Sequence, residues 1–170
     1  MRIFGALLLV TACTLLGIEQ ARKLYFRQRC LEEVLAALRF MEAELKNGAV
    51  PIPEIFWELS RFPDMKVQKF FMSLYEKTQN LGEESLAEIW TGCVLNDMSI
   101  SLSERQRQEL CRIGNFLGRY SENEQSGAIS ACAEHLEEEL KAASAKAKEG
   151  AKLYTGLGLT FGLMIATVLI

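Results

Sequence analysis

Residues that interrupt helices are scarce in this chain. Its three prolines, Pro51, Pro53 and Pro63, lie in one short stretch, so the rest is free of the strongest helix breaker. Valine and isoleucine are few outside the two ends, whereas leucine, alanine, glutamate, lysine and glutamine dominate. These residues favour helices, and no period-2 alternation indicates a strand. We therefore predict an all-α protein, and 170 residues suffice for one domain.

Sequence signatures of common enzyme classes are missing. None of GxxxxGK(S/T), GxGxxG, GxSxG or HExxH occurs, so nucleotide-binding, hydrolase and zinc-protease functions lack their required geometry. The net charge is −3 and the basic residues alternate with glutamates, which argues against nucleic acid as a partner. The five cysteines contain no CxxC, which indicates free thiols in a reducing compartment.

The chain has a single histidine, His135. Cys132 lies three residues before it, and Glu138 and Glu139 lie three and four residues after it, so all four fit one helix face. A metal site would still need ligands from another helix, and no second histidine exists. We expect no catalytic residue, no cofactor and no metal. The alternative is a helical membrane-anchored regulator that binds metal through His135.

Both ends of the chain carry long uncharged runs. Residues 3–18 and 153–170 contain sixteen and eighteen residues without a charge. As helices they rise about 24 and 27 Å, close to the ~30 Å hydrocarbon core of a bilayer. We predict transmembrane helices over 1–18 and 153–170, with a helical domain over 19–152 between them.

A cleaved signal is the alternative for the first run. Val10 to Cys13 resembles a lipoprotein cleavage box, so an exported lipoprotein modified at Cys13 stays open. We favour retention, because the apolar run continues to Ile18 and leads into a helical pattern without a cleavage site.

Basic residues follow the first run and precede the second. They are Arg22, Lys23, Arg27 and Arg29, and Lys141, Lys146, Lys148 and Lys152. Because basic flanks stay on the cytoplasmic side, both ends predict that the central domain is cytoplasmic.

Six helices are expected, the first and last of them long. Leucines recur every seven residues at Leu24, Leu31, Leu38 and Leu45, with Val34 and Met41 between them, which predicts one apolar seam on a helix that Gly48 ends. Further helices are expected over about 53–62, 64–80 and 85–97, from Ser101 or Ser103 to Gly118, and from Ser121 onwards. Asp64 is expected to cap the third helix, and Ser85 with Glu88 fits a capping box.

One turn is a candidate interface. Leu117-Gly118-Arg119-Tyr120 lies between two helices, where a glycine lets the backbone turn sharply. Arg119 and Tyr120 are residue types that often anchor interfaces. The alternative is that Arg119 pairs with a glutamate such as Glu122 and that Tyr120 covers the core.

The order of motifs resembles a known family. The segments are FGALLLV, LGIEQARK, LRFMEAELKNGAVPIPE, GEESLAEIW, IGNFLGRYSENEQSGAI, AEHLEEELKAA and LGLTFGL. Together they resemble the stage III sporulation protein AB family of endospore-forming Firmicutes. That family is itself similar to the inner-membrane platform protein of type II secretion and type IV pilus systems, which has a Gly-x-x-x-Gly near the end of its fifth helix, here Gly114 and Gly118.

The resemblance implies a function that the composition does not. It implies a non-enzymatic component of a secretion-like channel between mother cell and forespore, in the mother-cell membrane that surrounds the forespore after engulfment. The implied partners are the stage III sporulation AA ATPase and other membrane proteins of the same operon. A homo-oligomer is compatible with this role.

Overall fold

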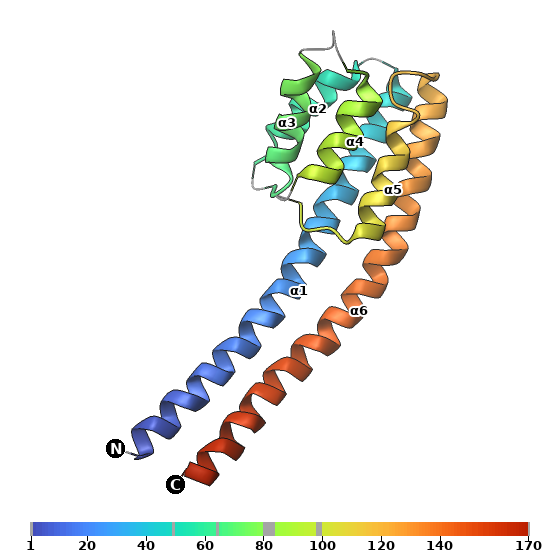
Figure 1. Ribbon diagram of the computed structural model, residues 1–170. Helices are drawn as coiled ribbons and strands as arrows, with labels where there is room; N and C mark the ends of the chain where they lie inside the picture. The colour runs from blue at the N-terminus through green and yellow to red at the C-terminus, as the bar shows by residue number, and fades with distance from the viewer. Residues whose placement is uncertain (1, 49, 64, 80–83, 98–99, 170) are drawn as a thin grey trace. The chain divides into compact units, whose positions relative to one another are not determined.

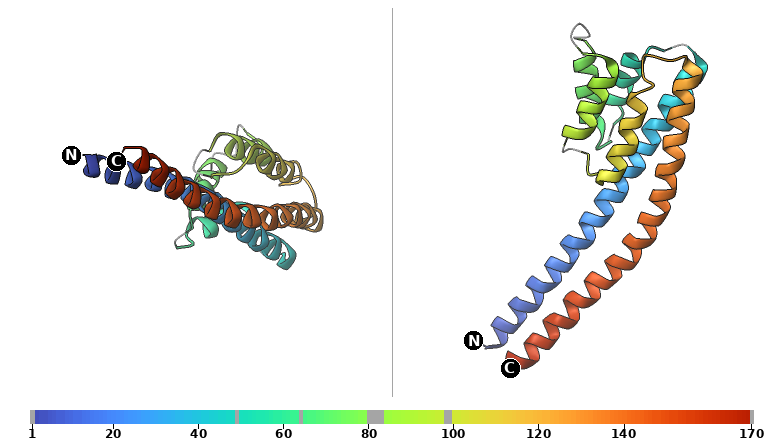
Figure 2. Two further views of the ribbon diagram at one scale, coloured as in Figure 1. Left: turned by 90° about the horizontal axis from the view of Figure 1, so that it is seen from below. Right: turned by 45° about the vertical axis from the view of Figure 1, so that its right-hand side comes forward.

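A computed structural model describes residues 2–48, 50–63, 65–79, 84–97 and 100–169, with the backbone alone for most of residues 2–17 and 146–169. These residues form six α-helices and no strand, so the all-α, six-helix prediction is confirmed (Figures 1 and 2). The helices are α1 (Arg2–Asn47), α2 (Ile52–Ser60), α3 (Gln68–Thr78), α4 (Leu86–Asn96), α5 (Glu104–Gly114) and α6 (Glu122–Leu169).

The chain divides into two compact units. The terminal unit comprises Met1–Gln28 and Lys141–Ile170, and the segments of α1 and α6 within it lie side by side (Figures 1 and 2). The bundle unit, Arg29–Leu140, holds α2 to α5 with the remaining parts of α1 and α6. Within the described residues, no helix combines the length and apolar character needed to cross a membrane. For most residues of the two predicted spans the structure describes the backbone alone. The predicted boundaries of the transmembrane helices, at residues 18 and 153, stay a prediction.

Local signals set most helix ends of the bundle unit. Ser85 and Ser103 each form a complete capping box, with Glu88 and Gln106 respectively, so the backbone N–H groups of the first turn are satisfied. Gly48 follows α1 with φ +66°, a left-handed conformation that suits a residue without a Cβ. Three expected helix ends are therefore confirmed.

Two expected boundaries were wrong. Helix α3 begins at Gln68 rather than Asp64, and Asp64 itself lies outside the described residues. The backbone N–H of Lys66 donates to the Glu33 carboxylate, a distant contact that holds the chain in a turn before α3. Helix α5 ends at Gly114 rather than Gly118, because bonds such as Phe116 N–H to Ile113 O, 2.9 Å, tighten the chain into turns.

An aromatic cluster forms the centre of the bundle unit. Phe56 of α2 stacks on Trp90 of α4 at 5.9 Å between centroids, and Phe70 of α3 meets Trp90 edge-on at 6.0 Å. The predicted seam of α1 packs into the same core. Its buried members are Leu31, Val34, Leu38, Met41 and Leu45, while for Leu24 the structure describes the backbone alone.

Arg107 of α5 is a buried cation that the sequence did not reveal. It is 9% exposed, and its guanidinium donates to the backbone carbonyls of Val94, Asp97 and Ile100. Val94 lies in the last turn of α4, where carbonyls lack helical partners and carry partial negative charge. Arg107 therefore caps α4 and holds the following loop.

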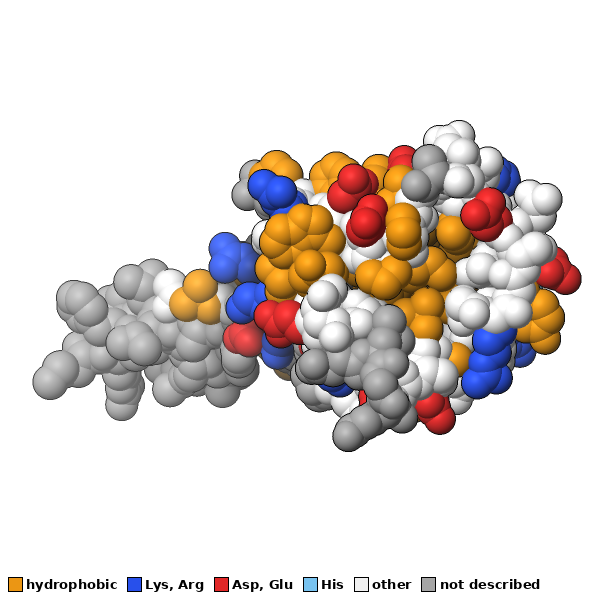
Figure 3. All heavy atoms as spheres, turned by 90° about the horizontal axis from the view of Figure 1, so that it is seen from above, with side chains coloured by type: hydrophobic (Ala, Val, Ile, Leu, Met, Phe, Trp, Pro, Cys, Tyr) orange, Lys and Arg blue, Asp and Glu red, His pale blue; other side chains and the backbone are white. Residues whose placement is uncertain are grey.

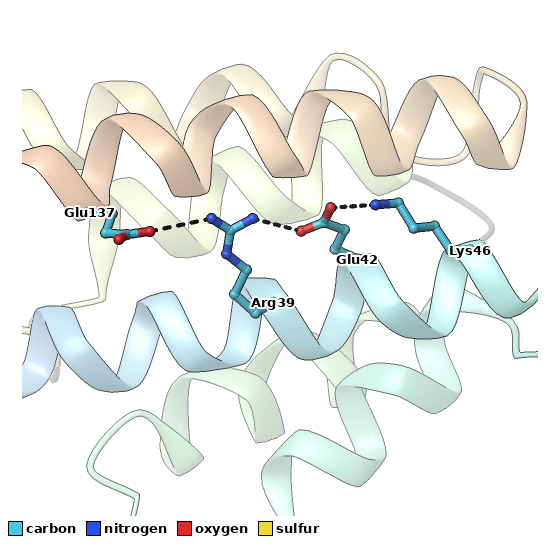
Figure 4. A network of polar contacts seen from close by, with 4 residues as sticks. All are labelled: Arg39, Glu42, Lys46 and Glu137. Carbon is cyan, nitrogen blue, oxygen red and sulfur yellow. Dashed lines mark hydrogen bonds and ion pairs between the residues drawn. The ribbon is translucent and has the colours of Figure 1, made fainter.

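A polar network joins α1 to α6 inside the bundle unit (Figure 4). The Glu42 carboxylate pairs with Lys46 at 2.7 Å and with Arg39 at 3.0 Å, and Arg39 also reaches Glu137 at 3.4 Å. Burial opposes ionisation of Glu42, but hydrogen bonds from Lys46, Arg39 and Ser130 outweigh it and lower its pKa to about 2. Glu42 therefore stays charged, and it is linked to α6 through the hydrogen bond from Ser130 and through Arg39, which also pairs with Glu137.

Candidate interaction site at the turn between α5 and α6

Close packing and a left-handed glycine build the turn. Gly114 ends α5 where a Cβ would lie 3.0 Å from Thr91 Oγ1 and 3.0 Å from Trp90 Cδ1, so only glycine lets α5 approach α4 this closely. Gly118 has φ +73°, and a Cβ there would lie 3.3 Å from Leu86 Cδ2. Packing and backbone conformation within the bundle therefore explain why both positions are glycine.

The buried side-chain amide of Gln125 holds the backbone of the turn through two hydrogen bonds. Gln125 of α6 is 7% exposed, its Oε1 accepts from Gly118 N–H at 3.2 Å, and its Nε2 donates to the Tyr120 carbonyl at 2.6 Å. Ser121 adds a cap, since its hydroxyl and backbone N–H both donate to Glu124 Oε2. The turn thus presents its side chains on a fixed backbone. The sequence patterns did not single out Gln125, which they show only as a polar residue one turn inside the last helix.

The turn carries three exposed side chains suited to contact. Tyr120 is 51% exposed and Phe116 is 37% exposed, and their ring centroids lie 5.4 Å apart. Arg119 is also exposed. Tyr120 therefore does not cover the core, and no ion pair among the described residues joins Arg119 to Glu122.

Arg119 instead contributes to the field at the start of α4. The pKa of Glu88 is lowered first by the hydrogen bond from the Ser85 backbone, then by the Ser85 hydroxyl, with the positive charge of Arg119 adding to the effect. Whether Arg119 and Tyr120 form an interface stays a prediction.

A groove between α5 and α6 adjoins the turn. It encloses about 260 Å³ and is lined by Glu109, Arg112, Ile113, Phe116, Ala128, Ala131, Cys132 and His135. Phe116 belongs to both the groove and the turn, so the two form one continuous surface. We call Phe116, Arg119 and Tyr120 with this groove the α5–α6 corner. Figure 3 views the bundle from above and shows hydrophobic side chains gathered among charged ones on its surface.

The groove also contains the residues considered for a metal site. His135 Nδ1 lies 3.8 Å from Glu109 Oε2, and the Cys132 thiol donates to the Glu109 carbonyl at 3.5 Å. Burial, aided by the negative charge of Glu109, raises the pKa of Cys132 to about 12, which disfavours the thiolate that a metal needs. Among the described residues, no three His, Cys, Asp or Glu side chains are placed to hold a metal ion.

The acidic residues after His135 do not complete that site either. Glu139 Oε1 pairs with Arg105 Nε at 2.9 Å, and Glu138 is exposed. The side chain of Cys13, the alternative lipid attachment site, lies outside the described residues.

A second exposed aromatic cluster was not expected from the sequence. Trp57 lies 4.8 Å from Tyr75 between centroids, and the Arg61 guanidinium lies 5.5 Å from the centre of the Trp57 ring. Trp57 is 37% exposed. Helix α2 has only nine residues, which are too few for hydrophobic periodicity to show which of its faces is exposed.

Comparison with known proteins decides the family. The model of the family described as stage III sporulation protein AB matches residues 2–170. The chain belongs to that family. It is 26% identical over 177 aligned positions to stage III sporulation protein AB of Bacillus subtilis (strain 168), with 99% of each chain covered. A role associated with sporulation follows from this membership, as the resemblance in sequence implied.

A solved structure supports the same fold. The chain matches stage III sporulation protein AB with a TM-score of 0.63 and 22% identity, over 69% of this chain and 93% of that one. At this identity the likeness shows the helical fold, and the roles of individual residues rest on the contacts described above.

Proposed function

We propose that the protein is a non-catalytic membrane platform component of a sporulation channel assembly, and that its helical bundle engages a cytoplasmic ATPase. The family resemblance supplies the partner, the stage III sporulation AA ATPase. The observation that carries the proposal is the α5–α6 corner, a rigid turn with exposed Phe116, Arg119 and Tyr120 beside an apolar groove.

Membrane anchoring is supported by the terminal unit. Leu15 and Met164 are 65% and 66% exposed there, within runs that carry no charge. Large apolar side chains that water would surround are better accommodated by lipid. With the basic residues beside both runs, the proposed topology places the bundle in the cytoplasm and the protein in the mother-cell membrane around the forespore.

The composition of the corner suits a protein partner. Aromatic residues and arginine are the types most enriched at binding hot spots. The contacts of Gln125 with Gly118 and Tyr120 fix the turn before binding, so little conformational entropy is lost on association. Removing Arg119 and Tyr120 should cost about 2 kcal/mol or more of binding free energy, which is about 30-fold in affinity.

Binding of the detergent-purified full chain to the purified ATPase tests this proposal. The variant Arg119→Ala/Tyr120→Ala should bind at least about 30-fold more weakly than the natural chain. The matched control Arg105→Ala/Leu95→Ala alters two exposed residues on α5 and α4 and should bind normally. Equal binding by the corner variant would contradict the corner, and a natural chain that does not bind would contradict the ATPase as partner.

The two alternative functions predict different observations. A regulator using His135 would contain stoichiometric metal that His135→Ala removes, and an exported lipoprotein would carry a lipid on Cys13. Elemental analysis and intact mass of the purified full chain separate both from the platform proposal.

A further inference from the structure

The terminal unit carries a cluster of basic and aromatic side chains just beyond the first uncharged run. Arg22, Lys23 and Arg27 are exposed, and so are Tyr25 and Phe26, at 49% and 43%. We call these five residues the basic collar. No acidic residue lies between Arg22 and Arg27.

The collar keeps most of its positive charge. Within it, Lys23 pairs with Glu19 at 3.2 Å, but both side chains are more than 60% exposed, at 63% and 62%. An exposed pair of this kind contributes about 0–1 kcal/mol and exchanges readily with other partners.

The angular spread of the collar fits a helix that passes through an interface. With 3.6 residues per turn, the five side chains occupy an arc of roughly 200° around α1. Phe26 lies between Arg22 and Lys23 on this arc, so aromatic and basic side chains are mixed. A helix lying flat on a membrane separates them onto opposite faces. Mixed aromatic and basic side chains instead occur where a spanning helix crosses the headgroup layer.

The spacing along the helix agrees with this placement. If the proposed span ends at Ile18, Arg22 lies about 6 Å and Arg27 about 14 Å further along the axis. The headgroup layer on each side of the hydrocarbon core is about 5–8 Å thick, and charges act over about 8 Å beyond it at physiological salt. All three basic groups therefore lie within reach of lipid phosphates.

We propose that the basic collar binds the phosphate groups of anionic phospholipids in the cytoplasmic leaflet, with Tyr25 and Phe26 set among the headgroups. This inference rests on the proposed membrane anchoring but not on the ATPase. Each basic residue near an anionic surface strengthens association about fivefold. The aromatic rings favour lipid over an acidic protein, because they are stable at the boundary between water and hydrocarbon.

Spin-labelled lipids measure this selectivity on the full chain. The protein is reconstituted into phosphatidylcholine vesicles with a trace of spin-labelled phosphatidylglycerol or phosphatidylcholine, and the motionally restricted fraction gives the relative association constant. We expect phosphatidylglycerol to be preferred at least about threefold, and less so at 1 M salt, where the screening length falls to about 3 Å.

Matched variants assign the preference to the collar. Arg22→Gln/Lys23→Gln/Arg27→Gln should lower the preference toward one, because the attraction of these three cations to the anionic headgroup is lost. The lysines that precede the second uncharged run, such as Lys152, remain in this variant. Lys69→Gln/Lys77→Gln/Arg105→Gln, which removes three exposed charges of the bundle unit, should leave the preference unchanged. Inorganic phosphate at millimolar concentration should not compete, since the headgroups are concentrated at the surface.

The failure of this inference is distinguishable from failure of the proposed function. A chain that inserts into vesicles but shows equal association of the two lipids, or a collar variant that keeps the preference, overturns the inference alone. A chain that does not float with vesicles overturns the membrane anchoring as well. Displacement of the lipid preference by an acidic peptide would assign the collar to a protein partner instead and overturn the inference.

Discussion

Trp90 of α4 donates a hydrogen bond of 2.7 Å from its indole Nε1–H to the backbone carbonyl of Leu110 on α5. One turn further along α5, Gly114 meets the edge of the same indole. Trp90 is 1% exposed and contacts Phe56 and Phe70. The position of α5, and with it the start of the α5–α6 corner, therefore depends on one side chain at the centre of the core.

Gly114→Ala should destabilise the bundle by about 1–3 kcal/mol, because the added methyl group overpacks the contact with Trp90 and Thr91. Urea unfolding followed by tryptophan fluorescence measures the change. Gly127→Ala is the matched control, since a Cβ there meets nothing within 4 Å and alanine stabilises a helix by up to about 1 kcal/mol relative to glycine. Equal effects of the two substitutions would contradict the close packing of α4 and α5.

Lowering the pH should destabilise the folded bundle, because Glu42 becomes protonated. Its folded-state pKa of about 2 lies below the ordinary 4.5, so its stabilising effect is present above pH 4.5 and is lost as the pH falls toward 2. This loss amounts to about 1–3 kcal/mol. Glu42→Gln should be less stable at pH 7 and show a flatter profile between pH 4.5 and 2, whereas Glu54→Gln, on an exposed side chain, should follow the natural chain. A natural chain whose stability is constant over this range would exclude the role of Glu42.

Membrane topology is best tested with new cysteines. Cys93 and Cys132 are 4% and 5% exposed, and burial raises the pKa of the Cys111 thiol, so these native thiols would react slowly in any compartment. In intact protoplasts, Lys69→Cys and Asn123→Cys, both exposed, should resist an impermeant maleimide until lysis. Arg2→Cys should react before lysis, because positive-inside orientation puts the amino terminus outside. Labelling of Lys69→Cys before lysis would reverse the topology.

Local sequence signals predicted the helices of the bundle well. The capping residue Ser85, the glycine Gly48 and the leucine seam of α1 act through the backbone and side chains within a few residues, which is the range that sequence patterns report. The sequence motifs alone indicated the family, and the match over residues 2–170 confirms it.

The helix ends and site residues that the sequence did not predict depend on contacts between residues far apart in the chain. The start of α3 depends on Glu33 holding Lys66, and the end of α4 depends on Arg107. The corner was predicted in part, since Arg119 and Tyr120 are exposed at a turn. Its supporting amide Gln125 and its adjoining groove depend on how α5 and α6 pack, which no local pattern encodes.

The proposed contact between the α5–α6 corner and the ATPase is tested most directly by site-specific photocrosslinking in sporulating cells. A photoreactive amino acid replaces Tyr120 in one strain and Leu95, which is 47% exposed on α4, in another. We predict that position 120 crosslinks to the stage III sporulation AA ATPase and that position 95 does not. An ATPase crosslink from position 95 but not from position 120, or from neither, would contradict the account.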